Sequence, residues 1–365
     1  MHISEFGGHK RASQNIKEAL SFINPYVKIL NVNGLGYLYP RSEKIVDLIY
    51  TTAIKRFPRL WGKIYDRRGV VKTIAPLMRV ASMIGFSKFS NLLKDFNPDV
   101  VVATQAFPCS VAAEFKKKIG LRFPLIAVVT DYHPHRFWIH SCVDSYIVAC
   151  EEAKHTLVNE GVSPEKIKIL GIPISHCFLN TYKKEDVVRE FGFEREFPAV
   201  LIMGGGLGFG PIKDVFLALN RINLPFQVIV VCGKNKALYS WFKKRKHKFR
   251  RPVFYFGYVN FVNKLMDFSD IIITKAGGIT ISEALSKELG IIVINPIPGQ
   301  EERNVEYLFK RKAIIKADSI SQVKYSVERL LKNTEELRIL KKEAKENSIR
   351  DSSLRIAYFI MDCLN

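Results

Sequence analysis

The sequence lacks the long apolar runs and paired cysteines that mark membrane-spanning and disulfide-rich proteins. No apolar run approaches the ~18 residues that a membrane-spanning helix needs, and the first residues do not form the apolar stretch of a signal peptide. The 6 cysteines include no C-x-x-C pair, and several lie within or beside apolar runs. We therefore expect reduced core cysteines in a cytoplasmic protein that neither spans a membrane nor is exported.

Familiar nucleotide and metal motifs are absent as well. The glycine-rich run at 204–210 does not end in the Lys-Ser/Thr of a Walker loop, and the next apolar run is followed by Cys232 rather than by the acid of a dinucleotide fold. There is no D-x-D motif, and the histidines of residues 130–141 lack the spacing and the cysteine partners of a zinc site. We therefore expect no metal and no cofactor, so that backbone amides, helix dipoles and basic side chains must stabilise any leaving-group charge.

Acidic residues are few relative to basic ones. The chain has 35 Asp and Glu against 56 Lys and Arg, a formal net charge of +21, which favours an anionic partner over a merely solvated lysine-rich surface. Residues 51–90 interleave basic residues with aromatics, which suits a segment lying in an anionic lipid interface. A second basic run at 241–251 fits a solvated helix face. We find no nucleic-acid-binding motif beside either run, so we expect an anionic membrane surface and no nucleic acid as partner.

Length and periodicity indicate two α/β domains. The chain has 365 residues, 47% of them hydrophobic and 25% charged, which is enough apolar material for two cores. Short apolar runs alternate with helix-period segments over 98–169 and again over 199–295, as in β-α-β units on parallel sheets. Charged residues, glycines and prolines interrupt the pattern at 171–197, and residues 319–365 are helical throughout. The predicted fold class is therefore α/β, with two doubly wound Rossmann-like domains.

The predicted boundaries follow from these shifts in pattern. We expect an N-terminal acceptor- and membrane-binding domain over 1–176, a linker over 177–197, a donor-binding domain over 198–348, and a terminal helix over 349–365 that packs back toward the N-terminal domain. The sequence does not indicate an oligomeric state.

Two glycine-containing turns between a strand and a helix are candidate phosphate sites. The first, GGGLGFG at 204–210, precedes a helix that can begin at Pro211, and the second, TKAGGITISEAL, begins at residue 274. Glycines let backbone amides and a helix N-terminus approach a phosphate. Glu283 lies one turn inside the second helix, where it can reach a ligand. The competing interpretation is a capping box formed by Thr280 and Glu283, which needs no ligand.

Three further segments carry groups for binding or catalysis. The loop NPIPGQEERN at 295–304 follows a buried strand, where ligands bind in open sheets, although a solvated loop has the same composition. His9 follows a glycine pair at the first helix and is a candidate general base, with a structural histidine as the alternative. Asp131 follows the strand at 124–129 and is the second candidate.

Taken together, GGHKRAS, TDYHPHRFWIH, GGGLGFGP, VCGKN, FYFGYV, TKAGGITISEAL and NPIPGQEERN resemble the ordered motifs of glycosyltransferase family 28, specifically its diacylglycerol sugar transferases. The resemblance covers about residues 3 to 330. It implies a GT-B fold, in which two such domains face each other across a cleft, and an inverting, metal-independent transfer from a UDP-hexose to a lipid hydroxyl. It also implies a peripheral location on the inner face of the cell membrane.

The residue patterns and the resemblance together give candidates for individual roles. The catalytic candidates are His9 and Asp131. The donor-binding candidates are Gly204, Gly205, Gly206, Gly208, Gly210, Gly257, Tyr258, Val259, Lys275, Gly277, Gly278, Thr280, Glu283, Gln300, Glu301 and Asn304. The candidates for acceptor or membrane contact are Gly8, His133, His135, Arg136, Trp138, Lys55, Arg56 and Trp61.

One departure from the family pattern concerns the start of the sequence. Family members have a full apolar strand before the Gly-Gly-His loop, whereas only Met1, His2, Ile3 and Ser4 precede Glu5 here. A strand that short gives His9 little support.

Two other functions fit the same motifs. One is transfer of N-acetylglucosamine to an undecaprenyl-linked precursor, and the other is a noncatalytic UDP-sugar sensor. The sequence does not separate glucose from galactose as the donor sugar, nor diacylglycerol from a glycosylated diacylglycerol as the acceptor.

Overall fold

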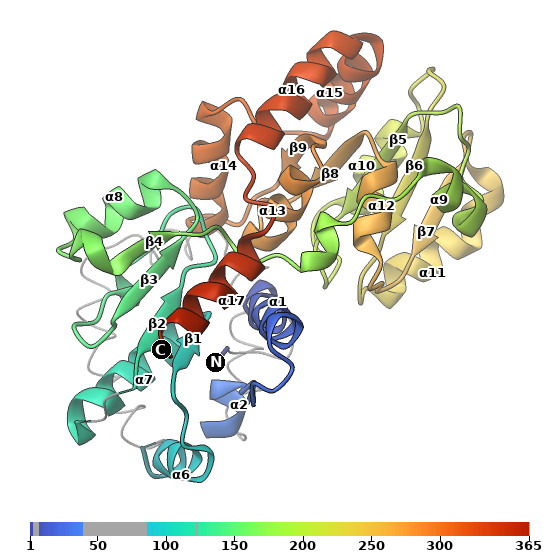
Figure 1. Ribbon diagram of the computed structural model, residues 1–365. Helices are drawn as coiled ribbons and strands as arrows, with labels where there is room; N and C mark the ends of the chain where they lie inside the picture. The colour runs from blue at the N-terminus through green and yellow to red at the C-terminus, as the bar shows by residue number, and fades with distance from the viewer. Residues whose placement is uncertain (3–6, 39–85, 121–122, 365) are drawn as a thin grey trace. The chain divides into compact units, whose positions relative to one another are not determined.

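The computed structural model describes residues 1–2, 7–38, 86–120 and 123–364, which form two compact units (Figure 1). The first unit comprises Met1–His176, Ile297–Arg303 and Asp351–Asn365, and the second comprises Cys177–Pro296 and Asn304–Arg350. Each unit is built around its own parallel sheet. The α/β class with parallel sheets that the sequence predicts is therefore confirmed.

The sheet of the first unit has the strand order β1-β2-β3-β4, with all neighbours parallel. The strands are β1 (Val101–Ala103), β2 (Leu125–Val128), β3 (Ser145–Val148) and β4 (Ile167–Ile169). The central strand β2 reads Leu-Ile-Ala-Val and is buried at every position, because helices cover both faces of a parallel sheet. The helices α7 (Ala106–Ile119) and α8 (Glu151–Asn159) make the crossovers between strands.

The first and last helices of the chain pack together in the first unit. Apolar residues of α1 (Gly8–Ile23) and α17 (Ser352–Asp362), including Ile16, Leu20 and Ile360, share one core with β2 and β3. In this unit the structure also describes the helices α2 (Gly34–Leu38) and α6 (Phe86–Phe96), with short 3₁₀ turns at Arg136–Trp138, Pro164–Lys166 and His176–Leu179. The terminal helix is thus part of the first unit.

The second unit contains a six-stranded parallel sheet in the order β10-β9-β8-β5-β6-β7. Its strands are β5 (Ala199–Met203), β6 (Gln227–Val231), β7 (Val253–Phe256), β8 (Ile271–Thr274), β9 (Gly290–Ile294) and β10 (Ile315–Ala317). Its helices are α9 (Lys184–Phe191), α10 (Ile212–Leu219), α11 (Lys236–Arg245), α12 (Val262–Phe268), α13 (Gly278–Ser286), α14 (Gln300–Lys310), α15 (Ile320–Lys332) and α16 (Thr334–Glu346), with a 3₁₀ turn at Lys246–Lys248. The first residues of α14 are grouped with the first unit.

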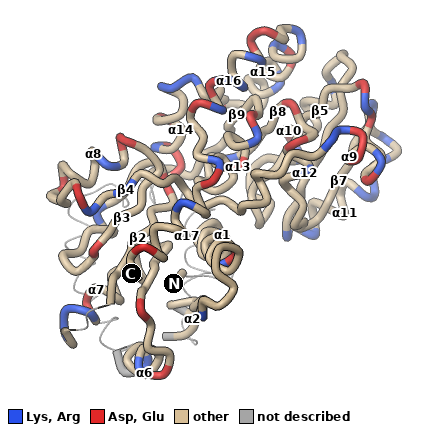
Figure 2. The backbone as a smooth tube through the Cα atoms, viewed as in Figure 1, with Lys and Arg blue, Asp and Glu red and all other residues tan. Residues whose placement is uncertain are grey.

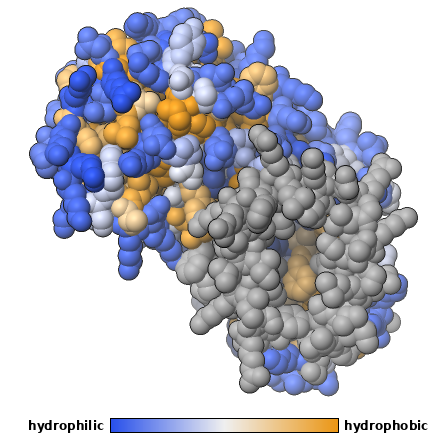
Figure 3. Space-filling view, turned by 180° about the vertical axis from the view of Figure 1, so that it is seen from behind, coloured by the Kyte–Doolittle hydropathy of each residue, from blue (hydrophilic) through white to orange (hydrophobic). Residues whose placement is uncertain are grey.

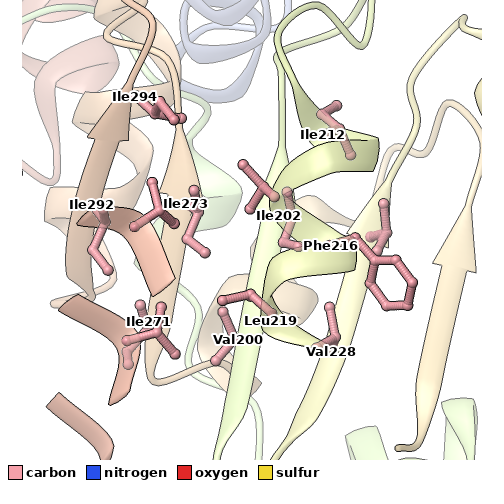
Figure 4. Close-up of a cluster of buried hydrophobic side chains, with 14 of the residues drawn as sticks. Val200, Ile202, Ile212, Phe216, Leu219, Val228, Ile271, Ile273, Ile292 and Ile294 are labelled. Carbon is pink, nitrogen blue, oxygen red and sulfur yellow. The ribbon is translucent and has the colours of Figure 1, made fainter. Parts of the chain in front are cut away.

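The core of the second unit lies between the sheet and α10 (Figure 4). Val200 and Ile202 of β5 point toward Phe216 and Leu219 of α10, and all four side chains are buried. Each such side chain contributes about 1.5–3 kcal/mol when fully buried. The alternating apolar runs over 199–295 are this core, which holds the strand ends and the loops that follow them in place.

Two strands of the structure are not predicted by the sequence analysis. The edge strands β4 and β10 have three residues each and include Lys168 and Lys316. The other strands contain no Lys, Arg, Asp or Glu; in Figure 2 Lys and Arg are blue and Asp and Glu are red. Edge strands are commonly short and carry lysine, which discourages pairing with other chains. They therefore lack the apolar run by which the central strands are recognised. Residues 177–197, which the sequence analysis assigns to a linker, belong to the second unit and include α9.

The structure can be compared with what the composition predicts about membrane-spanning helices, the surface and the cysteines. In the part of the chain that the structure describes, no helix is long and apolar enough to cross a bilayer. On the face shown in Figure 3, hydrophilic side chains surround smaller apolar patches. All six cysteines are free thiols. Cys109, Cys150 and Cys232 are buried as predicted, whereas Cys177 is exposed.

Candidate functional site

The connectivity of the second sheet creates a switch point between β5 and β8. Strand β5 pairs with β6 on one side and with β8 on the other, so the chain leaves these neighbouring strands in opposite directions. Ligands of open α/β sheets bind at such a point, outside the carboxyl ends of the strands. Here β5 leads into the loop 204–210 and β8 into residues 275–277. A Cβ placed on Gly205 would lie 3.8 Å from Cε of Lys275, so the two predicted phosphate loops lie side by side.

At three positions near this switch point, the close packing of loops or the backbone conformation requires glycine. Gly208 (φ 64°) and Gly233 (φ 56°) have left-handed backbone conformations, which glycine adopts without strain. A Cβ on Gly208 would overlap the carbonyl oxygen of Cys232, and one on Gly204 would overlap that of Phe209. The loop after β5 is thus pressed against the turn after β6. Glycine at 204 and 208 is explained by this packing, whether or not a phosphate binds.

The neighbouring glycines face candidate ligand-binding side chains. A Cβ on Gly206 would lie 3.6 Å from Cε2 of Tyr258, whose ring is 60% exposed after β7. Nζ of Lys234 lies 5.6 Å from the centroid of the same ring. An exposed aromatic ring beside a cation suits a planar, anionic ligand such as a nucleotide. The position of Lys234 next to Tyr258 depends on the pairing of β6 with β7, and no local pattern in the sequence indicates it.

The helix after β8 decides between the two interpretations of Glu283. Helix α13 begins at Gly278, with Gly277 as its N-cap residue. Thr280 is therefore the third residue of the helix and cannot be the N-cap of a capping box. Glu283 is 7% exposed on this helix. The capping alternative is wrong, and a buried carboxylate near the glycine turn remains as a candidate ligand group.

The loop before α14 is held by its own side chains. The carboxylate of Glu301 accepts a hydrogen bond from the backbone N–H of Ile297 at 2.8 Å, and Glu302 accepts one from Gly299 at 2.9 Å. Gly299 has φ 88°, which glycine allows. Farther along the helix, Nδ2 of the fully buried Asn304 donates to the carbonyl of Ala276 at 3.0 Å. Glu301 and Asn304 thus shape the loops at the site, a role that the sequence does not reveal.

In the first unit, His9 lies at the start of α1 between two oxygen atoms. Its Nδ1 is 2.9 Å from the carbonyl oxygen of Thr104 and 2.9 Å from Oγ1 of Thr130. Because a carbonyl oxygen only accepts, Nδ1 must carry the proton in this arrangement, and Nε2 then holds the lone pair of the neutral ring. Burial lowers the pKa of His9, while the charge of Asp131 and the Thr104 carbonyl act in the opposite direction. His9 is therefore a neutral imidazole at neutral pH, as a general base must be.

Asp131 lies near this histidine at the carboxyl end of β2. It is 4% exposed, and Nε2 of Gln300 donates a hydrogen bond to its carboxylate. Both residues belong to the first unit, since residues 297–303 are grouped with it. The structure thus brings two catalytic candidates, His9 and Asp131, close enough for their charges to interact.

The histidine-rich segment divides into surface and core residues. Nδ1 of His133 is 3.2 Å from Nη1 of Arg303. Burial lowers the pKa of His135 to about 3, and the ring packs against Phe137. Trp138 is 1% exposed, so its ring lies in the core and is removed from any surface that an acceptor or a membrane contacts.

The other candidates for acceptor or membrane contact are either exposed, paired or outside the described residues. Arg136 pairs with Glu160 at 2.7 Å, and Gly8 is the exposed first residue of α1. Lys55, Arg56 and Trp61 lie outside the described residues. Among the residues that are described, no group of three or more His, Cys, Asp or Glu is placed to hold a metal ion.

Comparison with known proteins identifies the family. Residues 9–174 match the family model of monogalactosyldiacylglycerol synthase, and residues 199–357 match that of the glycosyltransferase family 28 C-terminal domain. The chain is 31% identical over 331 residues to a processive diacylglycerol beta-glucosyltransferase of Bacillus pumilus, covering 89% of this chain and 82% of the relative. It belongs to the diacylglycerol sugar transferases of glycosyltransferase family 28. The resemblance inferred from the motifs is therefore confirmed, and the protein is a glycosyltransferase.

Another relative agrees with this assignment, and solved structures share the fold. The processive diacylglycerol beta-glucosyltransferase of Staphylococcus epidermidis is 29% identical over 362 residues, covering 98% of this chain and 90% of that protein. The enzyme's fold is similar to that of MurG from Acinetobacter baumannii, with a TM-score of 0.57 and 13% identity over 78% of this chain and 79% of MurG. It is also similar to UDP-GlcNAc 2-epimerase from Neisseria meningitidis, with a TM-score of 0.59 and 16% identity over 78% of this chain and 82% of the epimerase. The predicted GT-B fold is thereby confirmed.

Proposed function

We propose that this enzyme transfers glucose from UDP-glucose to the hydroxyl group of diacylglycerol, or of a glycosylated diacylglycerol, with inversion at the anomeric carbon. The names of its relatives support the acceptor and favour glucose over galactose. The observation that carries the donor site is the pair of glycine loops at the β5–β8 switch point, where Gly205 faces Lys275.

The donor diphosphate is assigned to this switch point. The backbone amides of Gly277 and Gly278 stand at the N-terminus of α13, where a helix dipole favours negative charge. Lys275 adds a positive charge beside the glycine-rich loop. The exposed ring of Tyr258 is a stacking surface for uracil, and Glu283 is a candidate partner for the ribose hydroxyls. The amides of the glycine turn, the helix N-terminus and Lys275 are the groups that stabilise the leaving-group charge.

The acceptor hydroxyl is assigned to His9. As the hydroxyl oxygen bonds to the anomeric carbon, the bond from that carbon to the UDP oxygen breaks, and UDP leaves with the electron pair. The hydroxyl proton passes to Nε2 of His9, while Nδ1 stays hydrogen-bonded to the Thr104 carbonyl. The nearby charge of Asp131 stabilises the imidazolium that forms. Attack from the side opposite UDP inverts the anomeric configuration.

We further propose that the reaction needs no divalent metal and takes place at an anionic membrane surface. The basic surplus of the chain and the lipid acceptor of its relatives support membrane association. The basic and aromatic segment assigned to the membrane, which includes Lys55, Arg56 and Trp61, lies mostly outside the described residues.

The decisive experiment is a transfer assay with radiolabelled donors. The protein is incubated with UDP-glucose, UDP-galactose or UDP-N-acetylglucosamine and with liposomes of phosphatidylglycerol that contain diacylglycerol, with and without EDTA. We expect labelled glucosyl-diacylglycerol from UDP-glucose in both EDTA conditions. Transfer only from UDP-N-acetylglucosamine to an undecaprenyl-linked acceptor would replace this function. UDP binding without turnover on any acceptor would identify a sensor. Loss of turnover in EDTA that manganese restores would refute the metal-free mechanism.

A further inference from the structure

A cluster of positive charge lies at the end of helix α11 in the second unit. Six of the eight residues 243–250 are Lys or Arg, and none is Asp or Glu. All six side chains are exposed, and among the described residues none of them forms an ion pair. We call these six residues the basic cluster: Lys243, Lys244, Arg245, Lys246, Lys248 and Arg250.

Helix α16 of the same unit carries its surface cations differently. Nζ of Lys341 lies 2.9 Å from a carboxylate oxygen of Asp270, and Nζ of Lys345 lies 3.0 Å from one of Glu288. Neighbouring like charges repel each other, and the dipole of α11 compensates only cations in its last turn, which ends at Arg245. A solvated helix face, the expectation from the sequence, therefore does not account for the basic cluster. Its unpaired charge favours an anionic partner.

The backbone that carries the basic cluster is anchored on the core of the unit. The N–H of Arg250 donates to Oδ1 of Asn220 at 3.0 Å. The ring of Phe249 packs edge-on against that of Phe216, with 4.6 Å between the centroids, and Phe216 is buried on α10. A surface whose backbone is already fixed loses less conformational entropy when it binds a partner. The cations of the basic cluster are therefore presented on a preformed surface.

Two aromatic side chains of α11 lie next to the basic cluster. Trp241 is partly exposed, with Nζ of Lys213 5.4 Å and Cζ of Arg245 5.2 Å from the centroid of its ring. Tyr239 is 37% exposed. Trp and Tyr are enriched at the interface of a bilayer, because each combines an apolar ring with a polar tip. A nucleic-acid base would need the face of such a ring for stacking, whereas the ring of Trp241 already contacts two cations. The combination favours lipid headgroups.

We propose that the basic cluster, together with Trp241 and Tyr239, is a docking surface for a bilayer of anionic phospholipids. This contact is additional to the one assigned to residues 51–90, and the choice of a bilayer over another polyanion rests on the lipid acceptor of the proposed function. Helix α11 leads from the carboxyl end of β6 to the amino end of the parallel strand β7, beside which it lies (Figure 1). The basic cluster therefore lies toward the opposite edge of the sheet from the glycine loops, so lipid and UDP do not compete for it.

The test measures partition of the full chain onto vesicles of phosphatidylglycerol and phosphatidylcholine by flotation. Two variants each replace three exposed lysines by glutamine, and residues 51–90 are unchanged in both. The cluster variant carries Lys244→Gln, Lys246→Gln and Lys248→Gln, and the control variant carries Lys332→Gln, Lys342→Gln and Lys345→Gln on α15 and α16.

Each basic residue at an anionic surface strengthens binding about fivefold. The cluster variant should therefore bind about 100-fold more weakly than the wild type, and the control variant nearly as tightly as the wild type. Raised salt should reduce this difference, since it screens exposed charges. Equal binding of the two variants would refute the proposal.

Further measurements separate charge from structure and locate the contact. Arginine at the three cluster positions should restore binding, and the cluster variant should keep the melting temperature and UDP affinity of the wild type. Vesicles should slow hydrogen exchange of the amides of residues 243–250 and leave those of α16 unchanged. Binding to double-stranded DNA that depends on the basic cluster, without binding to vesicles, would overturn the proposal and identify a nucleic-acid surface.

These readouts are separate from glycosyl transfer. The vesicles contain neither diacylglycerol nor a sugar donor, so a failure of the proposed transfer reaction would leave the binding result unchanged. Conversely, transfer to diacylglycerol in neutral detergent micelles tests the proposed function without an anionic bilayer, so it should proceed equally in the cluster variant and the wild type.

Discussion

Replacement of His9 by alanine tests the proposed catalytic base. The change removes the imidazole and its hydrogen bond to the Thr104 carbonyl. A positioned base contributes about 10²- to 10⁴-fold to the rate, or about 3–5 kcal/mol of activation free energy. We therefore expect turnover to fall by that factor. Loss of the contacts with the Thr104 carbonyl and the Thr130 hydroxyl costs about 1–3 kcal/mol of stability, so the variant should remain folded. UDP affinity should hardly change, because the proposed donor contacts belong to the second unit.

The pH dependence gives a second measure of the same role. The pKa of folded His9 lies below the usual 6.5, chiefly because of burial. The base is thus unprotonated at neutral pH, and kcat/KM should fall only as the pH drops through that lowered pKa. The acidic limb should disappear in the alanine variant if His9 is the titrating group.

The assay follows transfer from labelled UDP-glucose to diacylglycerol in liposomes over a range of pH values, with UDP affinity measured by calorimetry. His155→Ala is the matched control, because His155 is exposed on α8 in the same unit. It should keep full turnover. Wild-type turnover in His9→Ala together with its loss in Asp131→Asn would refute the assignment and make Asp131 the base.

Four further predictions concern single residues. Thr130→Val should shift the acidic limb of kcat/KM to lower pH, because the hydroxyl 2.9 Å from Nδ1 of His9, which can accept a hydrogen bond from the imidazolium, is lost, whereas a serine variant should not; an unchanged limb would exclude that contact. Glu283→Gln should weaken UDP binding about 10- to 150-fold, the equivalent of about 1.5–3 kcal/mol; unchanged affinity with a lower melting temperature would make Glu283 structural. Gly208→Ala should cost at least about 1–3 kcal/mol of unfolding free energy, because of its left-handed backbone and the overlap of the new Cβ with the carbonyl oxygen of Cys232; urea denaturation measures this cost. Gly257→Ala, whose Cβ would meet no atom closer than 3.9 Å, should cost less. His135→Phe should lower the slope of unfolding free energy against pH by up to about 1.4 kcal/mol per pH unit between pH 6.5 and about 3. Over that window the unfolded chain binds the proton that folded His135 excludes, so the wild-type protein loses stability as the pH falls; equal slopes would contradict the lowered pKa.

Local patterns determined the fold class and most of the elements. The central strands are recognisable because strands buried on both faces must be apolar throughout, as in the run Ile271–Thr274. The glycine-rich turns are recognisable because few other residues allow such tight loops. The strands β4 and β10 are not, because each has only three residues, one of them a lysine, and so lacks an apolar run. The ordered motifs determined the family, which no single motif does.

The tertiary structure decided which residues meet and which are covered. No pattern places Thr104 and Thr130 around His9, because residues 95 and 121 positions apart come together only through the parallel sheet. The sequence likewise left Glu283 open between a cap and a ligand group, and only the start of α13 at Gly278 excluded the cap. Trp138 reads as an interfacial aromatic, yet it lies in the core, because burial depends on what the rest of the chain packs against a side chain. Periodicity and glycine content thus follow from local backbone physics, whereas the surroundings of each functional group depend on contacts between distant segments.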